Sequence, residues 1–200
     1  LFAGNAVKLA AEQALERWQD EDRPAVGHCR WDAPKTSPDD HITAGEISVN
    51  SMLYGAHAVQ LAVDVETGSI TVERIAAAHD PGASVNRQQV EGQIEGGVIQ
   101  ALGWSLYENF ILSDGAIQTD TLSTYLVPTV SDIPPQVSSV IDELPDPLGP
   151  FGARGIGEIT FIPLAPAIID AIHDATGVWI NSIPVTPEVM LDELDKQSVT

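Results

Sequence analysis

The stretch "RQQVEGQIEGGVIQALGWSLYENF", residues 87–110, combines one apolar stripe with several glycines. Four apolar residues recur at four-residue spacing: Val90, Ile94, Val98 and Leu102. This spacing predicts a helix from Arg87 to about Leu102. Gly92, Gly96 and Gly97 interrupt the helix, and each costs about 1 kcal/mol relative to alanine. A helix tolerates such glycines where another backbone or a ligand must come close.

The segments that flank this helix are rich in strand formers. Residues 56–65 and 69–80 are two β-rich runs joined by "ETGS", residues 66–69, which predicts a hairpin. Beyond the helix we expect a strand over Trp104–Leu112 with a turn at "SDGA", residues 113–116. A short strand is expected over residues 137–144.

The two ends of the chain indicate further helices. An amphipathic helix is predicted over Gly4–Trp18, followed by a proline-containing loop over Arg30–Thr43. Residues 163–177 predict a helix that ends at Gly177, and residues 183–194 predict a short terminal helix. Helices and strands mix without regular βαβ alternation, so we expect an α+β fold, a mixed sheet with packed helices, in one domain over residues 1–200.

A second glycine-rich stretch, "GPFGARGIGEITFIP", covers residues 149–163 and carries one acid, Glu158. It lacks the Gly-x-x-x-x-Gly-Lys-Ser/Thr order of a phosphate-binding loop. Two interpretations remain open from spacing alone. The stretch is a structural turn, with Glu158 as a loop carboxylate paired with Arg154, or it is a site where backbone approaches a bulky cofactor and presents Glu158 beside it.

Composition excludes several classes of function. The formal net charge of −20 over 200 residues repels nucleic acid and anionic membrane surfaces. No apolar run approaches the length of a membrane span, and we expect a cytoplasmic protein. Cys29 is the single cysteine, so this chain alone forms no internal disulfide and holds no iron–sulfur cluster. The histidines show no metal-ligand spacing, and no metal-ligating residue is assigned.

Several segments, in order along the chain, resemble the molybdenum hydroxylases, the xanthine dehydrogenase and aldehyde oxidoreductase family. They are "GNAVKLAAEQAL" from Gly4, "WDAPKT" from Trp31, "NRQQVEGQIEGGVIQALGWSLYE" from Asn86, "TYLVPTVSDIP" from Thr124 and "GPFGARGIGEI" from Gly149. The resemblance implies that the chain is the C-terminal part of the molybdopterin-binding subunit. The sequence starts in mid-pattern without a methionine, so we expect a fragment or a split subunit.

The resemblance also implies roles for individual residues. Glu158 matches the glutamate that acts as general base beside the molybdenum, and Gln93 matches a glutamine that contacts the pterin. Backbone lining the cofactor is matched by Arg154, Gly155, Ile156 and Gly157. Residues that hold its phosphate or nucleotide part are matched by Asn86, Arg87, Gln88 and Gln89. A helix N-terminus suits that last task, because it offers free N–H groups to an anion.

What the resemblance implies about activity is hydroxylation of an N-heterocycle (purine- or nicotinate-like) or an aldehyde, with water as the oxygen source. The cofactor expected is molybdopterin cytosine dinucleotide, whose pterin sulfurs hold the molybdenum. Partners expected are the remaining part of the molybdenum subunit, an iron–sulfur subunit and a flavin subunit carrying FAD. The alternative is a non-catalytic interaction or scaffold subunit that keeps the fold.

Overall fold

The computed structural model describes residues 2–20, 23–32 and 52–198. Of the expected loop over Arg30–Thr43, and of the "WDAPKT" segment, the residues from 33 onward lie outside the described part. The chain separates into two compact units, and each is described by itself. One unit contains residues 1–54, 80–87 and 142–155; the other contains residues 55–79, 88–141 and 156–200. The single domain over residues 1–200 stays a prediction.

The larger unit is built on a three-stranded mixed sheet in the order β1-β2-β5. Its strands are β1 (Tyr54–Val63), β2 (Ile70–Asp80) and β5 (Gln136–Ile141). The predicted hairpin is confirmed, and at its turn the Gly68 N–H donates to the Asp64 carbonyl at 2.7 Å. β2 and β5 are parallel, with register from Arg74↔Gln136 to His79↔Ile141. Parallel neighbours need a long crossover, and the segment with the glycine-bearing helix provides it.

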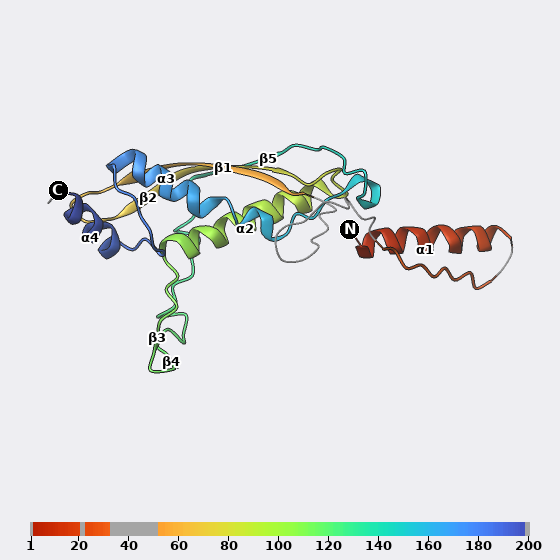
Figure 1. Cartoon of the computed structure of the whole chain (residues 1–200), viewed down its shortest axis with the longest axis horizontal. Helices are drawn as coiled ribbons and strands as arrows, with labels where there is room; N and C mark the ends of the chain where they lie inside the picture. Colours follow the sequence, from red (N-terminus) through yellow and green to blue (C-terminus); the bar gives the residue numbers. More distant parts are fainter. Residues whose placement is uncertain (1, 21–22, 33–51, 199–200) are drawn as a thin grey trace, which may run out of the picture. The chain divides into compact units, whose positions relative to one another are not determined.

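The described part of the chain contains four α-helices (Figure 1): α1 (Phe2–Gln19), α2 (Arg87–Leu106), α3 (Leu164–Thr176) and α4 (Pro187–Ser198). All four match helices that the sequence predicts. α3 ends as expected, because Gly177 takes a left-handed conformation at φ 76° and its N–H donates to the His173 carbonyl at 2.7 Å. The expected α+β fold is confirmed. Within the described residues, no helix has the length and apolar content that a membrane crossing requires.

The expected strand over Trp104–Leu112 is wrong. α2 continues to Leu106, and the strand there, β3 (Leu112–Ser113), pairs only with β4 (Ala116–Ile117) across the predicted turn. The aromatic residues favour a strand locally, but the apolar stripe of α2 extends one more turn, so that Leu106 is buried as well as Leu102. Burial of this stripe outweighs the local preference for a strand.

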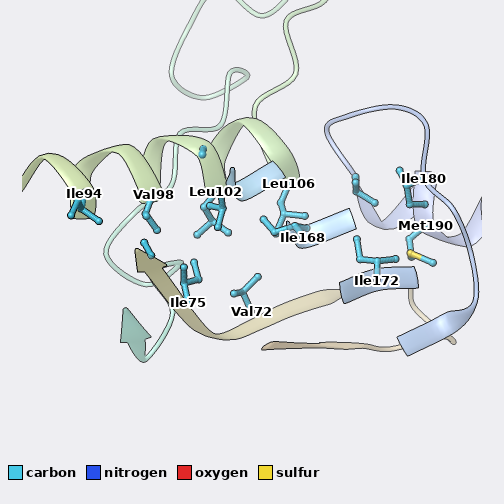
Figure 2. Close-up of a cluster of buried hydrophobic side chains, with 14 of the residues drawn as sticks. Val72, Ile75, Ile94, Val98, Leu102, Leu106, Ile168, Ile172, Ile180 and Met190 are labelled. Atoms are coloured by element: carbon cyan, nitrogen blue, oxygen red, sulfur yellow. The ribbon is translucent and has the colours of Figure 1, made fainter. Parts of the chain in front are cut away.

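The core of the larger unit lies between α2 and β2, with α3 and α4 closing one end (Figure 2). Ile94, Val98 and Leu102 of α2 face Val72 and Ile75 of β2. All three α2 side chains are fully buried. Each such side chain contributes about 1.5–3 kcal/mol, so the stripe outweighs the roughly 4 kcal/mol that the four glycines of α2 cost. The packing therefore explains why a glycine-rich segment is helical.

Two histidines meet at the end of the hairpin on neighbouring strands. The Nε2 atoms of His57 and His79 lie 2.8 Å apart, with the rings nearly perpendicular. One Nε2 must carry a proton and the other must lack it, because two N–H groups cannot face each other at that distance. Burial, and then the neighbouring His79, lower the pKa of His57 to about 4.

This pair makes the stability of the protein depend on pH. The pKa of His57 is about 4 in the folded chain against 6.5 for a free histidine, so the unfolded chain binds the proton first. The free energy of unfolding should therefore fall as pH drops from about 6.5 to about 4. Because His57 is half exposed, we expect a loss of about 1–3 kcal/mol. Urea denaturation of wild type and His57→Gln across this range measures it. An unchanged difference between the two proteins at every pH would contradict the assignment.

Candidate active-site cleft

A cleft of about 340 Å³ lies where the predicted base and the glycine-bearing helix meet in the larger unit. We call it the α2 cleft. Gly92, Gln93 and Gly96 line it from α2, and Gly157 and Glu158 line it from the segment that precedes α3. Gln93 and Glu158 are 65 positions apart in sequence, but both line this one cavity. A cofactor site at the glycine-rich stretch, residues 149–163, requires this arrangement.

The glycines give the cleft its shape. A Cβ atom at Gly92, at Gly96 or at Gly157 would meet nothing within 4 Å. This face of α2 is therefore bare backbone surface that a flat ligand can approach closely. The opposite face of the helix carries the buried stripe. One side of α2 therefore packs against the core, and the other side lacks side chains at its glycine positions.

The cleft contains polar groups but little charge. Glu158 is the one ionisable side chain among its described lining residues, and it is exposed. Gln93 and Gln100 supply amide groups, each of which can donate and accept hydrogen bonds. Gln100 was not among the residues predicted from sequence. Its spacing of seven from Gln93, two turns along one helix face, was the available signal.

In the smaller unit, the side chain of one predicted site residue, Arg154, belongs to a buried ion cluster. The Arg154 guanidinium contacts the carboxylates of Asp80 and Asp146, and all three side chains are at least 88% buried. Asp80 also accepts hydrogen bonds from the N–H groups of Gly82 at 2.8 Å and Leu144 at 3.2 Å. This cluster ties residues 144–154 to the end of β2. The guanidinium has its partners here, so pairing with Glu158 is not needed to satisfy it.

The remaining predicted residues divide between surface and core. Asn86, Arg87, Gln88 and Gln89, at the start of α2, are exposed. Gly155 is exposed with open space at its Cβ position, and Ile156 packs partly against the core.

A carboxylate already lies at the start of α2, within the smaller unit. Glu143 Oε1 accepts a hydrogen bond from the Ser84 N–H at 2.6 Å, and its other oxygen lies 3.7 Å from Arg87 Nη1. The hydrogen bonds from Ser84, with a smaller contribution from Arg87, lower the pKa of Glu143. An anionic ligand at this terminus would compete with that carboxylate for the same donors.

Comparisons with known proteins place the chain in a family. Residues 19–134 match the model of the "Molybdopterin cofactor-binding domain". The chain is 36% identical over 148 residues to the "Xanthine dehydrogenase molybdenum-binding subunit" of Escherichia coli O157:H7, covering 73% of this chain and 20% of that protein. The chain belongs to the molybdopterin cofactor-binding domain family of xanthine dehydrogenase and aldehyde oxidoreductase.

Solved structures agree with this assignment. The aldehyde oxidoreductase from Desulfovibrio gigas superposes with a TM-score of 0.84 and 31% identity, over 96% of this chain and 22% of that one. Quinoline 2-oxidoreductase from Pseudomonas putida 86 gives a TM-score of 0.68 and 36% identity, over 72% of this chain and 19% of that one. The chain thus spans about a fifth of the length of these relatives.

The buried ion cluster gives a prediction for stability. Arg154→Met keeps most of the side-chain length but leaves the carboxylates of Asp80 and Asp146 buried without their cation. Removing one partner of a buried ion pair costs about 3–5 kcal/mol. We expect a loss of this size in the free energy of unfolding, measured by urea denaturation at pH 7. Arg74→Met, at an exposed position on β2, is the control and should change it by less than about 0.5 kcal/mol. Equal losses in the two variants would refute a stabilising cluster.

Proposed function

We propose that the chain supplies the general base and one wall of the cofactor site of a molybdenum hydroxylase. The reaction proposed is hydroxylation of an N-heterocycle or an aldehyde, with water as the oxygen source. The observation that carries the proposal is the α2 cleft, in which Glu158 is the sole ionisable group among the described lining residues and faces a helix surface without side-chain bulk.

The residues of the α2 cleft fit a pterin cofactor. The bare backbone at Gly92 and Gly96 suits a flat ring system, and the Gln93 amide suits the polar atoms along a pterin edge. When bound, the molybdenum cofactor supplies the redox chemistry of the hydroxylation. We propose the cytosine dinucleotide form, with its phosphates toward the exposed start of α2 at Asn86, Arg87, Gln88 and Gln89.

The chain's own contribution to the reaction is proton transfer and positioning. The exposed carboxylate of Glu158 accepts the proton that water gives up as its oxygen is transferred to substrate. Gln93 orients the ring system, and the backbone of Arg154, Gly155, Ile156 and Gly157 brings the base to the cleft. The two electrons released by oxidation of the substrate would pass to iron–sulfur and flavin groups that partner segments or subunits would hold.

The substrate class is proposed from the relatives. The Escherichia coli protein is named for xanthine and the Pseudomonas putida enzyme for quinoline, both N-heterocycles, whereas the Desulfovibrio gigas enzyme is named for aldehydes. We therefore favour a purine- or nicotinate-like N-heterocycle. The chain covers about a fifth of these relatives, so the rest of the molybdenum subunit is the proposed source of the substrate pocket.

Glu158→Gln tests the base directly. It keeps the shape of the side chain and removes its proton-accepting capacity, which typically contributes about 10²–10⁴-fold to rate. In the assembled enzyme we expect the rate of reduction by substrate, followed by stopped flow, to fall at least about 100-fold with molybdenum content unchanged. Glu95→Gln, an exposed α2 glutamate, is the matched control for the change in charge and should stay near wild type. A Glu158→Gln enzyme that is fully loaded and reduced at the wild-type rate would favour the non-catalytic scaffold.

Gln93→Ala tests the cofactor wall. Because Gln93 is exposed on α2, its truncation leaves the core unchanged, and the helix should keep its stability. If the amide binds the cofactor, molybdenum per assembled protein, measured by elemental analysis, should fall severalfold. Gln118→Ala, at an exposed position next to β4, should retain full occupancy. Equal molybdenum content in the two variants would exclude a binding role for Gln93.

A further inference from the structure

The hydroxyl of Thr160 joins the two elements that form the α2 cleft. Thr160 is 1% exposed and lies two residues after Glu158. Its Oγ1 atom is 3.1 Å from the Gln93 carbonyl oxygen and 2.9 Å from the Gly157 carbonyl oxygen. The single hydroxyl proton is thus shared between two acceptors, the backbone carbonyl of Gln93 and the backbone carbonyl of Gly157, which directly precedes Glu158.

Gly97 makes this contact sterically possible. A Cβ atom at position 97 would lie 1.9 Å from Thr160 Oγ1 and 2.8 Å from Thr160 Cβ, so any other residue would push Thr160 away. The adjacent Gly96 differs, because a Cβ there would meet nothing within 4 Å. The two neighbouring glycines therefore serve different purposes: Gly96 opens the cleft, and Gly97 lets Thr160 lie against the helix.

We propose that Thr160, lying against Gly97, is a positioning residue that fixes the Glu158 carboxylate relative to Gln93. This inference rests on the proposed function of Glu158. Glu158 is exposed, and its short 3₁₀ turn (Glu158–Thr160) has no side-chain cap at its start. Thr160 is the buried end of that turn, and its hydroxyl, beside the ring contact of Phe161 with Trp104, links the turn and with it the base to α2.

The hydroxyl, and not just the shape of the side chain, is required by this geometry. In Thr160→Val a methyl group would replace Oγ1 at 2.9 and 3.1 Å from two carbonyl oxygens, closer than carbon and oxygen pack without a hydrogen bond. The Gly157 carbonyl would also lose a buried donor. The turn should therefore open more often. Thr160→Ser keeps the hydroxyl and should restore the contact.

Hydrogen exchange and reduction kinetics on the assembled enzyme test the proposal. In Thr160→Val we expect amides of residues 157–162 to exchange about tenfold faster, whereas Thr160→Ser stays near wild type. The limiting rate of reduction by substrate should fall at least about tenfold, with less than about a twofold change in the substrate concentration for half-saturation and with molybdenum content retained. Rescue by serine in both measurements separates positioning from general destabilisation.

The neighbouring glycines give an independent test that does not depend on activity. Gly97→Ala should accelerate exchange in residues 157–162 as Thr160→Val does, whereas Gly96→Ala, with the same gain in helix propensity, should not. Wild-type exchange in both Thr160→Val and Gly97→Ala would overturn the inference. The inference would also be overturned if Glu158→Gln abolishes reduction but Thr160→Val, with faster amide exchange, is reduced at the wild-type rate. If Glu158→Gln is reduced at the wild-type rate while amide exchange is faster in Thr160→Val, the proposed function of Glu158 is refuted, but the contact between Thr160 and α2 is supported.

Discussion

Helix α2 packs against the sheet with one face and forms a wall of the α2 cleft with the other. The architecture of the larger unit depends on both contacts. Apolar side chains at every fourth position press on β2, while Gly92 and Gly96 leave the other face bare. The buried stripe provides the stability that the glycines remove. A helix of better intrinsic propensity would fill the cleft with side chains, and a helix with a weaker stripe would not hold its shape next to a ligand.

In the smaller unit, a buried ion cluster holds a segment that has little apolar packing. Residues 142–155 are rich in proline and glycine, and none of their large apolar side chains is fully buried, so hydrophobic packing alone holds them weakly. The ion cluster of Arg154 with Asp80 and Asp146 takes that part, together with backbone N–H groups donated to the Asp80 carboxylate. Loss of water around three buried charges makes such a cluster costly to form and more costly to break.

Much of this could be predicted from the sequence, because the strongest signals are local. The stripe Val90–Leu102, the Gly177 cap and the "SDGA" turn each specify their conformation through neighbouring residues. The strand expected over Trp104–Leu112 failed because burial of Leu106 depends on tertiary packing that aromatic residues do not reveal. The partners of Arg154 and the contact between Gly97 and Thr160 join residues far apart in sequence, which no local pattern specifies. That Glu158 and Gln93 line one cleft was reachable only through the family resemblance, since spacing alone favoured a structural turn and could not exclude a cofactor site.

The proposed function of this chain depends on binding of the molybdenum cofactor in the α2 cleft, with Glu158 beside the metal. The most direct measurement is diffraction from crystals of the assembled enzyme, collected above and below the molybdenum absorption edge. If the cofactor binds there, we expect a single anomalous peak in the cleft, next to the Glu158 carboxylate, with planar density along the Gly92–Gly96 face of α2. A fully occupied molybdenum peak away from Glu158 and Gln93 would contradict it.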